Sequence, residues 1–76
     1  MPRFYFDVRQ DNQLVTDAEG EEHPNAAAAQ REAALAVAHL SKELLRGEPG
    51  QLVVEVRDEE GRPVVRAKIS LDVQIP

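Results

Sequence analysis

The sequence predicts an α+β domain in which one helix packs on one face of a four-stranded antiparallel sheet, in the order β-β-α-β-β. Stretches near both ends of the chain alternate apolar and polar residues, a pattern typical of half-buried strands. The stretch between them, residues 26–46, is rich in alanine, leucine and charged residues, which favour a helix. Polar turns divide the alternating stretches into pairs, so we expect two hairpins that flank the helix.

The first hairpin is predicted from the opening residues. Arg3–Arg9 alternates so that one face carries Phe4, Phe6 and Val8. Gln10-Asp11-Asn12 is typical of a turn, because Asp and Asn tolerate left-handed backbone angles. Leu14–Thr16 then returns as a short strand.

A polar loop, Asp17–Asn25, leads to a helix that we expect over Ala26–Arg46. Asn25 occupies the N-cap position, where its amide oxygen can accept from the first free helical N–H groups, and Gly47 fits the C-terminal end. One apolar stripe at helical spacing comprises Ala29, Ala33, Val37, Leu40 and Leu44.

The second hairpin follows the connector Glu48-Pro49-Gly50. Its first strand alternates through Leu52, Val54 and Val56, and Gly61 supplies the positive φ that the turn Asp58–Gly61 needs. The last strand, Val64–Val73, is the longest. We expect a common core of Phe4, Phe6, Val37, Leu40, Val54, Ile69 and Leu71.

Length and composition limit what the chain can be. Its 76 residues suffice for one domain, 1–76, which buries a modest core and gains from self-association. Without cysteine it forms neither disulfides nor a thiolate zinc site, which suits a reducing cytoplasm. A net charge of −5 argues against general binding to nucleic-acid phosphates. No apolar run is long enough to span a membrane, and Met1–Val8 lacks the order of a signal peptide, so we expect a cytoplasmic protein.

The sequence predicts no catalytic, cofactor or metal site, and hence no enzyme. His23 and His39 lie far apart and lack a paired nucleophile, while Ser41 and Ser70 lack a nucleophile-elbow context. The acidic loop at residues 17–22 could hold a hard cation such as Ca²⁺, but its spacing does not match a calcium loop. The alternative is a solvated loop whose charge favours the following helix N-terminus.

Two surfaces are candidates for interaction. The sheet face away from the helix carries more basic than acidic residues, with Tyr5 as its only aromatic. Such a face could meet an anion, although cross-strand pairs such as Glu55 with Arg66 would also explain it. On the helix, Leu35 and Leu45 lie off the main stripe and could form a subunit contact. The candidate interaction residues are Tyr5, Arg57, Arg66, Lys68, Leu35 and Leu45.

The sequence also resembles a family of small α-proteobacterial, rhizobial-type proteins of unknown function. The resemblance rests on an MPRYFFDV-like start (Met1–Val8), the loop Asp17-Ala18-Glu19-Gly20 and the hairpin Val56–Val64. It spans nearly the whole chain and implies a bacterial, cytoplasmic protein, but no activity. His23 stands where the family pattern has an aliphatic residue, which implies looser packing at that corner.

Two functional hypotheses follow. The first is a non-enzymatic interaction domain that self-associates, as a homodimer, and binds another protein. The second is a nucleic-acid-linked regulator, an antitoxin-like partner that uses the basic sheet face; it rests on fold-level analogy. Salt-sensitive retention on RNA or DNA would favour the second, and co-purification of a defined protein would favour the first.

Overall fold

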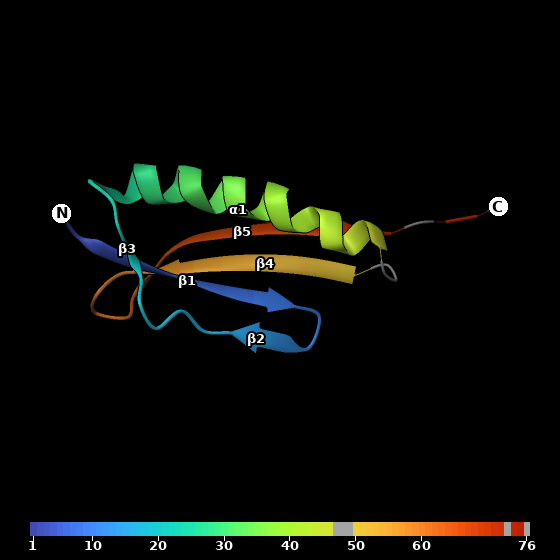
Figure 1. The fold of residues 1–76 in the computed structure, drawn as a ribbon, viewed down its shortest axis with the longest axis horizontal. Coiled ribbons are helices and arrows are strands. Elements are labelled where there is room, and N and C mark those ends of the chain that lie inside the picture. The colour runs from blue at the N-terminus through green and yellow to red at the C-terminus, as the bar shows by residue number, and fades with distance from the viewer. Residues whose placement is uncertain (47–49, 73, 76) are drawn as a thin grey trace.

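The computed structural model describes residues 1–46, 50–72 and 74–75, and of residues 43–46 it describes the backbone alone. Figure 1 shows α1 lying over β4 and β5, with β1 and β2 farther from the helix. The elements in chain order are β1 (Arg3–Gln10), β2 (Gln13–Val15), β3 (Glu21–Glu22), α1 (Ala26–Arg46), β4 (Gly50–Arg57) and β5 (Pro63–Leu71).

All strand pairs in the sheet are antiparallel, which confirms the predicted α+β class. Four strands lie in the order β2-β1-β4-β5, and β3 also pairs with β1, making five. The expectation of four strands is therefore wrong by one. β3 is only two residues long and lies inside the polar loop, so no alternation in the sequence could reveal it.

The turn between β1 and β2 forms as the sequence predicts. Asp11 takes a left-handed φ of 52°, a conformation that aspartate tolerates. Its N–H donates to the Gln51 carbonyl at 3.2 Å, and its Oδ1 accepts from the Gln51 N–H at 3.2 Å. A Cβ at Gly50 would lie 2.5 Å from that same Oδ1, so a larger residue here would displace the Asp11 carboxylate.

Asn25 caps the helix, as predicted. Its Oδ1 accepts from the Ala28 N–H at 2.9 Å, and its carbonyl accepts from the Ala29 N–H at 3.3 Å. Because alanine side chains are small, α1 can lie close to the sheet, and Ala29 and Ala33 are completely buried. No helix in the described part of the chain combines the length and the apolarity that crossing a bilayer requires.

The strands β1, β4 and β5 each turn alternate residues toward α1, and we call this side the helix face and the opposite side the open face. Register places Phe6 beside Val56 and Val8 beside Val54. The helix-face residues of β5 are Val65, Ala67 and Ile69, which lie beside Val56, Val54 and Leu52.

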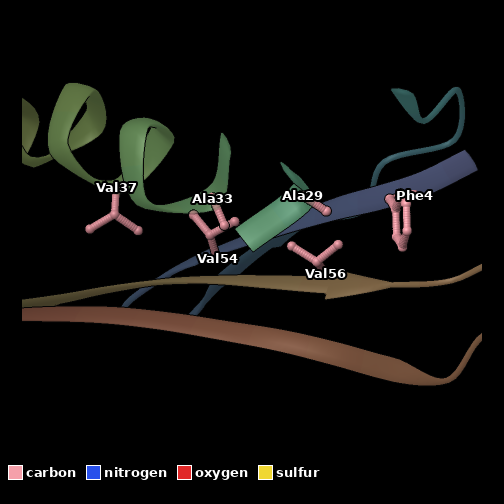
Figure 2. Packing of buried hydrophobic residues seen from close by; sticks show 6 residues of the cluster. All are labelled: Phe4, Ala29, Ala33, Val37, Val54 and Val56. Carbon is pink, nitrogen blue, oxygen red and sulfur yellow. The ribbon is translucent and has the colours of Figure 1, made fainter. Parts of the chain in front are cut away.

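The core lies between α1 and this helix face. Figure 2 shows side chains of α1 pointing toward β4, with Phe4 at one end of the group. Its buried members are Phe4, Ala29, Ala33, Val37, Val54 and Val56, and Phe6, Val8, Ala36, Val65 and Ala67 pack against them.

Four residues of the predicted core, including the half-buried Phe6, are less buried than expected. Ile69 is 36% exposed, and Leu40 and Leu71 are half-buried. Ile69 and Leu71 lie on β5, an edge strand with a described neighbour on one side only, so their outer flank remains open. The side chains of Leu44 and Leu45, together with Val73 and the connector residues Glu48 and Pro49, lie outside the described residues.

Two leucines provide a matched test of which surface is the core. Leu52 is 1% exposed on β4, whereas Leu35 is 58% exposed on α1. We expect Leu52→Ala to lower the free energy of unfolding by about 2–5 kcal/mol, the usual effect of removing a core leucine. Leu35→Ala should change it by less than about 0.5 kcal/mol. Urea unfolding at one fixed protein concentration measures both, and equal effects would show that the helix is assigned the wrong inner face.

Candidate functional site

The acidic loop is organised around one carboxylate. Asp17 Oδ2 accepts from the Phe6 N–H of β1 at 3.1 Å. Its Oδ1 accepts from the N–H groups of Glu19 and Gly20, each at 3.0 Å. The Asp-x-x-Gly spacing therefore brings the side chain back onto the backbone of its own loop, as aspartate does in turns. Among the described residues, no group of three or more His, Asp or Glu side chains is arranged to hold a metal ion.

The pKa of Asp17 reports the balance of these contacts. Burial by itself would raise it, but the N–H groups of Gly20, Phe6 and Glu19, followed by the charge of Arg57, outweigh burial. The pKa of Asp17 therefore lies below its ordinary value. A carboxylate held ionised by backbone donors stabilises a loop and is poorly suited to proton transfer near neutral pH.

Arg57 joins β4 to this loop and to β1. Its Nε donates to Asp7 Oδ2 at 2.9 Å, and its Nη2 donates to the Asp17 carbonyl at 2.8 Å. Asp7 Oδ1 in turn accepts from the Asp17 N–H at 2.9 Å. The guanidinium carbon lies 4.6 Å from the centre of the Tyr5 ring. Two of the six predicted interaction residues, Tyr5 and Arg57, thus meet on the open face in a network that fastens the loop.

In the turn between β4 and β5, an aspartate again accepts from backbone N–H groups of its own loop. Asp58 Oδ1 accepts from the N–H groups of Glu60 and Arg62 at 3.0 and 2.9 Å. The Arg62 N–H is the main reason that the pKa of Asp58 lies below its ordinary value. Gly61 has a φ of 81°, which confirms the predicted left-handed position. Glu59 Oε1 accepts from the Arg3 N–H at 3.0 Å, which attaches this turn to the start of β1.

His23 does not loosen its corner of the fold, contrary to the expectation from the family pattern. Its ring centre lies 6.2 Å from that of Phe4 and 5.7 Å from that of Phe6, and the side chain is only 16% exposed. Nε2 lies 3.1 Å from Glu21 Oε2. The imidazole therefore extends the aromatic end of the core, while its polar atom reaches the loop surface. His39 is exposed on α1 and is not brought to His23.

The open face contains three basic side chains, Arg9, Arg66 and Lys68, which we call the cationic row. Register sets Val53 between Arg9 of β1 and Lys68 of β5, and Glu55 beside Arg66. Val53 is only 2% exposed although it faces away from the core, and the long apolar stems of Arg9 and Lys68 flank it in the register. The ion pairs of the described residues include none formed by Arg9, Arg66 or Lys68. The suggested Glu55–Arg66 pair is thus adjacent in register but forms no ion pair within that set.

The two edges of the sheet differ. On the side of β1, the neighbours are β2, with three residues, and β3, with two, and Asp17 bonds to β1 between them. On the other side, β5 runs for nine residues with no described strand beyond it. Its only proline is its first residue, Pro63. We call this outer side of β5 the free edge.

The hydrogen-bonding direction of each strand identifies the groups on the free edge. Phe6, on the helix face of β1, directs its N–H away from β4, toward Asp17. In antiparallel pairs alternate residues bond to opposite neighbours, so the open-face residues of β1 bond to β4 and the helix-face residues of β4 bond to β5. The open-face residues of β5 therefore turn their N–H and C=O groups outward. These residues are Arg66, Lys68 and Ser70.

A family model for DUF6894, a domain of unknown function, matches residues 3–70. The chain belongs to the DUF6894 family. The matched segment begins with β1 and includes β5 as far as Ser70, so the free edge lies within the family domain. Comparison with curated proteins and comparison with solved structures found no match.

The structure places five of the six predicted interaction residues of this DUF6894 domain, in three locations. Tyr5 and Arg57 form one contact, and Arg66 and Lys68 share the open face of β5. Leu35 is exposed on α1, away from the sheet, and the side chain of Leu45 lies outside the described residues. The sequence analysis missed the role of Asp17, although its Asp-x-x-Gly spacing is a usable signal for a carboxylate that accepts from its own loop.

Gly20 and Gly61 both have a left-handed φ. Replacing each by alanine therefore distinguishes the cost of backbone strain from the cost of a steric clash. A Cβ at Gly20 would lie 2.9 Å from the Phe4 carbonyl oxygen and 2.9 Å from a Tyr5 ring carbon, whereas a Cβ at Gly61 would meet no atom within 4 Å. We expect Gly61→Ala to cost about 1–2 kcal/mol, from backbone conformation alone. Gly20→Ala should cost clearly more, because the Phe4 backbone cannot move aside. Thermal unfolding of both variants tests this, and a larger loss for Gly61→Ala would contradict the structure of the loop.

Proposed function

We propose that this domain is a non-enzymatic interaction module that self-associates through the free edge of β5. The observation that carries the proposal is the contrast between the two edges. Beyond β1 lie only the short strands β2 and β3, whereas β5 is open over nine residues. A long edge strand presents a row of N–H and C=O groups that a further strand can pair with. Natural domains commonly shorten, bend or cover such edges, and the β1 side of this sheet follows that practice.

The size of the domain supports the proposal. A chain of 76 residues without cysteine relies on one modest core, here built around two alanines, three valines and one phenylalanine. Pairing β5 with another strand would add hydrogen bonds and cover Ile69 and Val64, which are 36% and 38% exposed. Association of this kind stabilises the folded form by mass action.

The contacts of the titratable groups support a binding role over a catalytic one. Asp17 and Asp58 accept from backbone N–H groups, and Asp7 accepts from Arg57. These carboxylates are thus bonded to groups of the protein itself, whereas a catalytic acid or base must contact a substrate. A cytoplasmic location, which a chain without cysteine suits, is part of the same proposal.

The nucleic-acid hypothesis has weaker support. Readers of single strands stack bases on several aromatic side chains. The open face offers Tyr5 alone, and the Arg57 guanidinium already lies over that ring at 4.6 Å. The cationic row of Arg9, Arg66 and Lys68 is small beside a net charge of −5. We therefore favour a protein partner, and specifically a second copy of the chain.

Replacing Lys68 by proline removes one N–H donor from the free edge without breaking a hydrogen bond between β4 and β5 of the same copy. The Lys68 N–H points to the free edge, so Lys68→Pro should remove a donor for association while β4 and β5 stay paired. Lys68→Ala is the matched control, because it removes the charge and keeps the N–H. Sedimentation equilibrium at micromolar concentration should show dimers for the original chain and for Lys68→Ala, and monomers for Lys68→Pro.

The melting temperature should rise with protein concentration for the two dimeric forms only. Circular dichroism of Lys68→Pro checks that the variant is folded. A monomeric mass for the original chain, with a melting temperature independent of concentration, would refute self-association. An unchanged dimer in folded Lys68→Pro would refute the use of β5.

A further inference from the structure

We infer that two copies pair β5 with β5 in antiparallel fashion, about a two-fold axis that passes beside Ile69. This inference rests on the proposed function and specifies the register and the contacts of the self-association. Small homo-oligomers most often close by such a two-fold axis, which sets the same surface of each copy against itself. The structure limits where along β5 the axis can lie.

The outward hydrogen-bonding groups define the candidate registers. Arg66, Lys68 and Ser70 supply the N–H and C=O groups of the free edge, so they must form the hydrogen-bonded pairs of any new ladder. An axis beside Ala67 sets Arg66 opposite the partner's Lys68, and an axis at Lys68 sets that residue opposite its own copy. An axis beside Ile69 sets Lys68 opposite the partner's Ser70. An axis at Ser70 shortens the overlap within the described strand.

Overlap and charge together decide among these registers. An axis at Ser70 would also set Lys68 opposite the partner's Asp72, but it pairs only residues 69–71 of β5. Like charges directly opposite one another destabilise an antiparallel pair, and this disfavours the axes at Ala67 and Lys68. With the axis beside Ile69, Arg66 lies opposite the partner's Asp72, directly after the end of β5. Asp72 is exposed, and its Oδ2 accepts from Gln74 at 3.2 Å, which leaves its other oxygen for a cation. The two basic residues thus disfavour two of the four registers, and the longer overlap favours the axis beside Ile69 over the axis at Ser70.

The apolar contact at the axis agrees with this register. Ile69 lies on the helix face and is 36% exposed, an unusual degree for an isoleucine of the predicted core. On the axis it would meet its own copy in a closely spaced pair, with Cα atoms about 4.5 Å apart. Each copy would then cover the outer flank of the other copy's Ile69.

The position of α1 is compatible with the same arrangement. The helix packs on both β4 and β5, so its axis lies about half a strand spacing inside β5. Strands are about 4.8 Å apart, which would set the two helices about 10 Å apart on one face of a continuous sheet. Packed helices are usually 8–10 Å apart. Ala34 and Ala38 are exposed on α1, and such small side chains would permit a close approach of a second helix.

A cysteine scan along β5 locates the axis, because the chain has no cysteine of its own. Single variants Ala67→Cys, Lys68→Cys and Ile69→Cys are oxidised in a glutathione buffer, with Val15→Cys on β2 as a control of equal chemistry. A disulfide needs Cα atoms about 4.4–6.8 Å apart. Only the residue beside the axis meets this distance, since its neighbours lie about 8 Å from their own copies.

We expect Ile69→Cys to form a disulfide-linked dimer at least tenfold faster than the other three variants, as measured by mass spectrometry under non-reducing conditions. Faster linkage at Ala67 or Lys68 would overturn the register and leave self-association through β5 intact. Slow linkage at all three β5 positions in a chain that sediments as a dimer would also overturn the axis beside Ile69. A monomer in sedimentation would overturn both proposals.

A charge exchange tests the register without thiol chemistry. Asp72→Arg sets two arginines opposite each other at both ends of the ladder, and we expect the dimer Kd to rise about tenfold. Arg66→Glu combined with Asp72→Arg restores opposite charges and should return the Kd to near its original value. Sedimentation equilibrium measures the Kd directly. A double variant that is weaker than Asp72→Arg alone would overturn the pairing of Arg66 with the partner's Asp72.

Discussion

The carboxylate of Asp17 occupies the place beside β1 that a neighbouring strand would otherwise take, and the surface chemistry of the domain depends on it. It accepts the Phe6 N–H directly, while Arg57 holds the loop in position through the Asp17 carbonyl and Asp7. With this side of β1 occupied by a side chain and two very short strands, β5 offers the longer edge for extending the sheet. The acidic loop, which the sequence analysis considered as a possible cation site, is therefore the element that covers part of β1. β5 is then the single long open edge among the described residues.

The small core has a second consequence for the surface. Ala29 and Ala33 let α1 lie close to β4 and β5, and the helix contributes little bulk of its own to the interior. The helix consequently covers the side of the sheet near the free edge, while β2 keeps Leu14 and Val15 exposed at 52% and 67%. The elements that would meet a second copy are thus gathered on one side. In the proposed dimer, stability and association would be linked, because the same strand supplies core residues and the interface.

The basic residues of the open face have separate roles. Arg57 is held between Asp7 and the Asp17 carbonyl, and Arg3 bonds to the loop carbonyl of Glu19 and to Glu22. Arg66 and Lys68 lie outside the ion pairs of the described residues and sit on the edge strand itself. Charges on an edge usually discourage pairing. In the proposed dimer, their spacing would penalise two registers and permit the one beside Ile69, so that a protected edge could still accept one defined partner.

Local chemistry was sufficient to predict the α+β class, the Asn25 cap, the left-handed Gly61 and the helix over Ala26–Arg46, because each depends on residues adjacent in the chain. Phe4, Val37 and Val54 are buried as their periodicity indicates. The two-residue strand β3, the partial exposure of Ile69 and the burial of Val53 on the open face required the fold, because each depends on which strand lies beside which. The role of Asp17 lies between these cases, since its bonds to Glu19 and Gly20 are local and its bond to Phe6 is not. Alternation along a strand gives its two faces, but strand order decides its edges, and only the tertiary structure shows that β5 is the strand left open.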